Sequence, residues 1–119
     1  MANPNIVNVV SIYGKTAVQS VTTSAAAIVE NTAASGKIIK INSLVISNID
    51  GTNSADVTVD FFRSSTSYKL ANTITVPADA SLVVVSKDTS IYLEEGDSLR
   101  CLASADGDLQ AVCSYEEIS

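Results

Sequence analysis

Two acidic clusters are the residues best suited to chemistry in this 119-residue sequence. Glu94, Glu95 and Asp97 surround one glycine, and Asp106 and Asp108 flank another. Paired carboxylates are the groups that hydrolyse glycosides and ligate Ca²⁺. Neither cluster has the spacing of an EF-hand, and adjacent strand residues such as Glu94 and Glu95 point to opposite faces. We interpret both clusters as solvated loops, with weak Ca²⁺ binding as the open alternative.

A nucleophile with a matching base is not evident in the sequence. There is no histidine, which is the commonest general base and the commonest transition-metal ligand. Serine and threonine are abundant, but no G-x-S-x-G, Ser-x-x-Lys or P-loop pattern activates one of them. We therefore assign no catalytic, cofactor-binding or metal-ligating residue, and we predict that the protein is not an enzyme.

The two cysteines, Cys101 and Cys113, lie on segments with matching apolar alternation. If the chain turns back through residues 106–108, Cys101 falls directly opposite Cys113 on an adjacent strand. A disulfide is within reach only if the two residues form a close, non-hydrogen-bonded pair. Synthesis in a cytoplasm favours two buried thiols instead. A zinc site would lack its third and fourth ligands.

The elements that must position these residues are strands, because short runs of Val, Ile, Thr and Tyr alternate with Gly, Asn, Asp and Ser. The segment 56–62 predicts one dry face and one wet face, with Asp56, Thr58 and Asp60 on the wet face. The segment 24–34, which contains three successive alanines, is the only helix-compatible stretch, and we interpret it as a strand. The predicted strands span residues 6–13, 17–23, 25–29, 37–48, 56–62, 68–76, 81–86, 91–93, 98–103 and 109–115.

The turns and spacing of these strands indicate the fold class. Asp50-Gly51, Gly96-Asp97 and Asp106-Gly107 fit hairpins or short loops, and the apolar phase of 37–48 changes midway, as at a bulge or a corner between sheets. Strands about every ten residues without amphipathic helices predict an all-β, antiparallel β-sandwich or barrel, jelly-roll-like or Ig-like. We predict one domain over residues 1–119, with residues 1–5 as a loose arm.

The amino-acid composition limits the classes of molecule that this protein is expected to bind. A net charge of −6 with scattered basic residues argues against nucleic acid. The apolar runs are far shorter than the ~20 residues that span a bilayer, and the first residues lack the pattern of a secretory signal. With 46% hydrophobic and 17% charged residues, apolar surface is left for protein partners.

Aromatic side chains are candidate anchors for such partners. Phe61 and Phe62 are adjacent in a predicted strand, so one of them should lie on the outer face, where a partner could cover it. The absence of tryptophan weakens a sugar-binding platform, although tyrosine can serve in one. The four tyrosines, which we interpret as core or interface anchors, are Tyr13, Tyr68, Tyr92 and Tyr115.

Six segments in order resemble one family: residues 40–48, 50–51, 55–60, 76–82, 91–99 and 112–118. Together they look similar to small virion proteins of tailed bacteriophages, especially phages of cyanobacteria and other aquatic bacteria. The resemblance implies a β-sandwich displayed on a virion, as a capsid decoration or cement protein or as part of a tail or fibre. It transfers no catalytic or binding residue to this sequence.

The expected function is therefore structural. We expect a capsid decoration protein located in the virion. Its expected partners are the major capsid protein and further copies of this chain, in a homotrimer. The alternative is a tail or fibre component that binds a receptor or carbohydrate.

Overall fold

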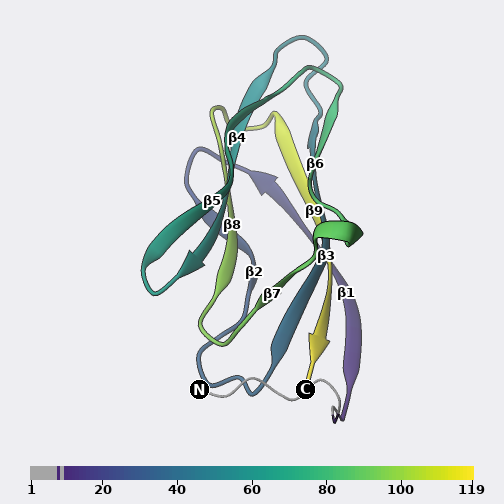
Figure 1. The fold of residues 1–119 in the computed structure, drawn as a ribbon. Coiled ribbons are helices and arrows are strands. Elements are labelled where there is room, and N and C mark those ends of the chain that lie inside the picture. The colour runs from purple at the N-terminus through teal and green to yellow at the C-terminus, as the bar shows by residue number, and fades with distance from the viewer. Residues whose placement is uncertain (1–7, 9) are drawn as a thin grey trace.

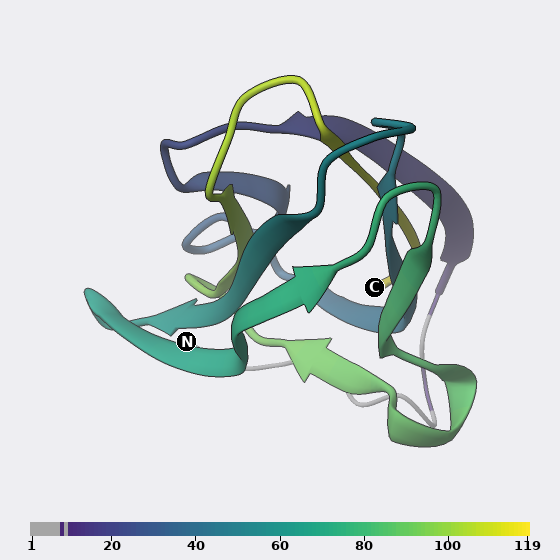
Figure 2. The same cartoon turned by 90° about the horizontal axis from the view of Figure 1, so that it is seen from above.

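The computed structural model describes residue 8 and residues 10–119, and this part of the chain forms two antiparallel β-sheets packed face to face (Figures 1 and 2). The predicted arm at residues 1–5 lies outside the described residues. The strands are β1 (Ile12–Val21), β2 (Ala26–Glu30), β3 (Ile38–Asn48), β4 (Ala55–Arg63), β5 (Thr66–Val76), β6 (Ser81–Val85), β7 (Ile91–Leu93), β8 (Ser98–Ala103) and β9 (Leu109–Ile118).

The order of the strands defines a jelly roll. We call the sheet with the order β1-β9-β3-β6 sheet A; β7 also belongs to it and pairs with β3. Sheet B has the order β2-β8-β4-β5. The chain changes sheet at each connection except the β4–β5 hairpin and the β6–β7 break, and this alternation is that of the jelly roll. The predicted antiparallel β-sandwich is confirmed, and the jelly-roll alternative, rather than the Ig-like one, describes its topology.

One edge of sheet A consists of two short strands, β6 and β7, which pair with successive parts of β3. β7 lies beside residues 39–41 of β3, and β6 lies beside residues 44–47. Between them the chain makes the 3₁₀ turn η1 (Lys87–Thr89), closed by hydrogen bonds between Ser86 and Thr89. Because η1 is the one helical element of the described residues, no helix there is long and apolar enough to cross a membrane.

The core lies between the sheets, where alternate residues of each strand point inward. Ile41, Leu44 and Ile46 of β3 face Val57 and Val59 of β4, and none of these side chains is exposed to solvent. The other large buried apolar side chains are Val21, Val76, Leu93, Leu99 and Leu109.

The N-terminal half of the chain differs from the sequence prediction. Separate strands were expected over 6–13 and 17–23, but residues 12–21 form the single strand β1, whose register with β9 is uninterrupted. Gly14 does not break this strand, since it lies exposed opposite Glu116 with open space around it. Residues 6, 7 and 9 lie outside the described residues.

The phase change predicted in segment 37–48 is a bulge. The register of β3 against β9 shifts between Ile41 and Ser43, as the sequence indicated. The alternative of a corner between sheets is wrong, because β3 pairs with β9 along its whole length. The segment 25–29, predicted as a strand, is confirmed as β2 over Ala26–Glu30.

The glycine turns join strands of different sheets. Asp106-Gly107 lies between β8 in sheet B and β9 in sheet A, so Cys101 and Cys113 are not neighbours in one sheet. The tight hairpin is instead β4–β5, whose two turn residues, Ser64 and Ser65, have φ angles of 53° and 60°. Two positive φ angles define a type I′ turn, which matches the twist of the flanking strands. The sequence lacks the usual Asn-Gly signal there, which is why the hairpin was missed.

Candidate interaction surface

The first acidic cluster is held by an arginine rather than arranged for a cation. Arg63 at the end of β4 donates from Nε and Nη2 to the two carboxylate oxygens of Asp97, at 2.8 and 2.6 Å. Arg63 Nη2 also donates to Glu94 Oε2 at 2.7 Å. Asp97 is only 2% exposed, and it accepts a further hydrogen bond from the backbone N–H of Glu94. The hydrogen bonds to Asp97 raise the pKa of the Arg63 guanidinium.

This arrangement ties the two sheets together. Glu94 and Asp97 lie in the loop from β7 of sheet A to β8 of sheet B. Arg63 is the last residue of β4, next to the turn of the β4–β5 hairpin. Glu95 points elsewhere and accepts a hydrogen bond from the backbone N–H of Gly36 at 2.6 Å, so Glu94 and Glu95 diverge as predicted. Among the described residues, no three His, Cys, Asp or Glu side chains are grouped to hold a metal ion.

The two carboxylates of the second acidic cluster lie in the β8–β9 loop and contact two different neighbouring loops. The backbone N–H of Thr23 donates to Asp106 at 2.8 Å, whereas Asp108 lies beside Asp50, the residue that follows β3 by two positions. Backbone N–H groups of Thr52 and Asn53 lower the pKa of Asp50. Partial burial, followed by the charge of Asp50, raises the pKa of Asp108. Asp106 and Asp108 therefore do not converge on one site.

Cys101 and Cys113 are free, buried thiols in opposite sheets. Cys101 lies on β8 and Cys113 on β9, and both belong to the apolar core. Burial raises the pKa of each thiol to about 12, and for Cys101 the nearness of Cys113 and Asp60 adds to the effect. The disulfide alternative is not realised in this structure, and the thiols remain in their neutral form at ordinary pH.

The outer face of sheet B is charged and covered by its own side chains. Asp60, predicted to face water, is buried because Lys69 on β5 lies over it, with Nζ 3.0 Å from Oδ1. Arg100 on β8 is the cross-strand partner of Asp60 on its other side and stacks 4.3 Å from the ring centroid of Phe62. Thr58 on the same face is likewise buried and accepts a hydrogen bond from the Thr73 backbone.

The two adjacent phenylalanines take opposite faces, as the sequence predicted. Phe61 packs against the core, and Phe62 lies on the outer face of sheet B. Arg100 covers the Phe62 ring, so this ring offers less free apolar surface than the sequence suggested.

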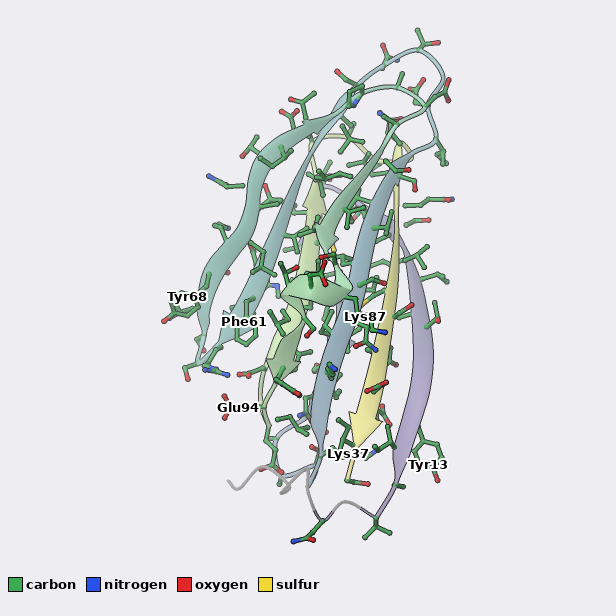
Figure 3. The ribbon with its side chains drawn as sticks, turned by 45° about the vertical axis from the view of Figure 1, so that its right-hand side comes forward. Tyr13, Lys37, Phe61, Tyr68, Lys87 and Glu94 are labelled. Atoms are coloured by element: carbon green, nitrogen blue, oxygen red, sulfur yellow. The ribbon has the colours of Figure 1, made fainter. Side chains whose placement is uncertain are left out.

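The tyrosines are distributed over the edges of the sandwich. Tyr13 on β1 and Tyr68 on β5 lie on opposite sides in Figure 3, and both are exposed. Tyr92 on β7 is exposed as well, whereas Tyr115 packs against the core. Three of the four tyrosines are therefore available at the surface.

Each sheet has a long free edge. β1 is the edge of sheet A and β5 the edge of sheet B, and within the described residues each pairs with a strand on one side only. Lysine on an edge strand normally hinders pairing with another chain. Here the single lysine of each edge turns back to its own sheet, where Lys15 meets Glu117 at 3.1 Å and Lys69 meets Asp60.

The outer face of sheet A is an open surface with exposed apolar side chains. Val18 is 75% exposed and Val112 is 42% exposed, and they are cross-strand partners on β1 and β9. A shallow cavity of about 460 Å³ lies at these strands. The sequence carried a signal for this surface that was not used: a valine between two polar residues recurs in β1, β3 and β9, as Thr16-Val18-Ser20, Ser43-Val45-Ser47 and Gln110-Val112-Ser114.

Known proteins share the fold with this chain. Neither family models nor curated proteins match the sequence. A protein of Bacillus endospore appendages, described as a novel family of disulfide-linked pili, is similar in structure with a TM-score of 0.53 and 18% identity, over 92% of this chain and 87% of that chain. Because the identity is so low, the likeness establishes the fold alone.

A second structure is a pentameric capsid protein isolated from metagenomic phage sequences. It has a TM-score of 0.42 and 18% identity, and the match covers 87% of this chain but only 60% of the capsid chain. A likeness this loose does not bear on function. The class defined so far is a jelly-roll β-sandwich with two long free edges.

Proposed function

We propose that this chain is a structural subunit of a phage virion, and that it acts there as a capsid decoration or cement protein. The observation that carries the proposal is the free edge of β1: ten residues in uninterrupted register with β9, whose one lysine is occupied by Glu117. Soluble proteins usually blunt such an edge with charge, proline or a bulge. The resemblance of six ordered sequence segments to virion proteins of tailed phages points to the same role.

Pairing of the β1 edge with a neighbouring chain would supply the mechanism. An added strand satisfies the outward backbone N–H and C=O groups of β1, and Ile12 and Tyr13, both exposed, would gain apolar contact. We propose the major capsid protein and further copies of this chain, in a homotrimer, as the partners. Because the same contact would be repeated at many symmetric positions, even a modest binding energy per contact would stabilise the shell.

Deletion of the gene from the phage that encodes this chain tests the role. We expect particles without the protein to lose infectivity faster on heating, and we expect the purified chain to restore their resistance when it is added back. Particles that are equally heat-resistant without the protein would contradict the cement role.

Two sets of substitutions test the edge itself. Lysines on β1, Ile12→Lys with Tyr13→Lys, should abolish rescue because they block pairing at that edge. The matched pair on β5, Thr66→Lys with Leu70→Lys, adds the same charge to the other edge and should leave rescue intact. Circular dichroism verifies the fold of the β1 variant. If the folded β1 variant still restored heat resistance, the proposed role of the β1 edge would be contradicted.

A further inference from the structure

We propose that the outer face of sheet A is a self-association surface, on which a second copy of this chain packs face to face about a two-fold axis. The inference deepens the proposed function, on which it rests, by naming a second contact between copies besides the β1 edge. Strands β1, β9, β3 and β6, which form this face, lie side by side in Figure 1.

A row of four valines crosses the face at right angles to its strands. The register pairs Val18 with Val112, Val112 with Val45, and Val45 with Val83, so that each of the four strands contributes one valine. Val83 is 58% exposed, Val45 is half-buried, and the other two valines are exposed. A continuous row of exposed β-branched side chains on one sheet face is apolar surface of the kind that a second sheet covers.

The rows on either side of the valines are polar but uncharged. One side carries Ser20, Gln110, Ser47 and Ser81, which are cross-strand partners in that order. The other side carries Thr16, Ser114 and Ser43. None of these side chains has a formal charge, in contrast to the outer face of sheet B, where Arg100, Asp60 and Lys69 lie in one row.

The absence of charge from these rows permits another copy of this chain to occupy this face. Two copies each carry a net charge of −6 and repel one another over most of their surfaces. The three uncharged rows allow two copies to approach without opposing carboxylates. A two-fold axis along the valine row places valines against valines and the hydroxyls of one row against the hydroxyls and the Gln110 amide of the other, which is the self-complementarity that an isologous contact requires.

The area of the face is sufficient for a modest interface. Strands β1, β9 and β3 have ten or eleven residues each and β6 has five. At about 4.8 Å between strands and about 3.3 Å per residue, they make a face of roughly 550 Å². Two such faces bury roughly 1,100 Å² together, which is above the roughly 1,000 Å² expected of a biological interface and below the standard size. We therefore expect a reversible association, most populated where many copies are held together.

Sedimentation equilibrium of the purified full chain over a range of concentrations tests the inference. We expect the mass to double with rising concentration, whether the smallest unit is one chain or a trimer. Raising NaCl from about 0.05 M to about 1 M should strengthen the association, because salt screens the repulsion between the acidic copies.

Val112→Glu and Leu70→Glu form a matched pair of variants. Both positions are 42% exposed and both substitutions add one negative charge, but Leu70 lies on β5 outside the proposed face. Val112→Glu should weaken the association at least about tenfold, because each copy would bury an uncompensated carboxylate. Leu70→Glu should leave it unchanged. Val112→Thr keeps the branched shape and should weaken the association by a smaller factor. It tests the same position if the glutamate variant does not fold.

Three results would overturn the inference. These are a mass that does not rise with concentration, an association that Val112→Glu leaves intact, and an equal loss in Leu70→Glu, which would move the contact to the β5–β6 side. The phage rescue assay keeps the two proposals apart. If the particles are stabilised by a chain that never self-associates through this face, the inference fails and the proposed function stands.

Discussion

Arg63 and Asp97 are 34 residues apart in the sequence but meet through two parallel hydrogen bonds of 2.8 and 2.6 Å. The fork of the guanidinium matches the two carboxylate oxygens, which is the strongest geometry for such a pair. Since Asp97 is buried and Arg63 ends the β4–β5 hairpin, the contact holds that hairpin to the loop between the two sheets.

Arg63→Ala should lower the free energy of unfolding by about 2 kcal/mol, because Asp97 would remain buried without its counter-charge. This value is below that of a fully buried pair because the arginine side chain is partly exposed. Urea unfolding followed by circular dichroism measures the change. Lys87→Ala on the exposed η1 turn is the control and should cost about 0.5 kcal/mol or less. Equal losses for Arg63→Ala and Lys87→Ala would contradict this role.

The Ser64-Ser65 turn should be improved by residues that prefer positive φ. Ser64→Asn with Ser65→Gly should stabilise the protein by about 1 kcal/mol, since both backbone conformations then carry less strain. Differential scanning calorimetry should show a rise in Tm of about 4 °C. Ser67→Gly, in β5 rather than in the turn, should instead lower Tm. A drop in Tm for the turn variant would mean that the turn is not type I′.

The buried thiols should be unreactive in the folded protein. A thiol reagent at about pH 8 should label neither Cys101 nor Cys113 until the protein is unfolded, because the reactive thiolate is suppressed by burial. Mass spectrometry should find no modified chain before denaturation and two added groups after it. Rapid labelling of the native chain would show that the core opens at these strands.

The same thiols should make stability fall at alkaline pH. Their pKa is about 12 in the folded chain against an ordinary value of 9.0, so the folded state retains protons that the unfolded state releases. Stability is complete below pH 9.0 and declines above it by about 1.4 kcal/mol per pH unit for each thiol. Urea unfolding of Cys101→Ala with Cys113→Ala should show a shallower decline. Equal slopes for the variant and the unaltered chain would show that these thiols do not cause the decline.

The strands were predictable because their signal is local. Short apolar or alternating runs bounded by polar residues marked β7 and β8 at their observed ends, and the change of apolar phase in segment 37–48 located the bulge of β3. The connections were not predictable in this way. Asp106-Gly107 indicates a turn, but the sheet that the next strand joins depends on packing elsewhere in the chain.

The side-chain contacts that define the two outer faces could not be predicted from the sequence either. Asp60 was assigned to a wet face, yet Lys69 and Arg100 from two neighbouring strands bury it. The valine row exists only because the register aligns one valine from each of four strands. Once β1, β9 and β3 are known to be neighbours, their repeated polar-Val-polar pattern gives the row directly.

The central claim is the proposal that this chain is a capsid decoration protein. Its copy number in purified virions tests this proposal most directly. Quantitative mass spectrometry against isotope-labelled peptides of this chain and of the major capsid protein gives that number. A decoration protein repeated over the symmetric shell should be present in on the order of hundreds of copies per particle. A few to a few dozen copies would place the chain in the tail or fibre, and its absence from the virion would contradict the account altogether.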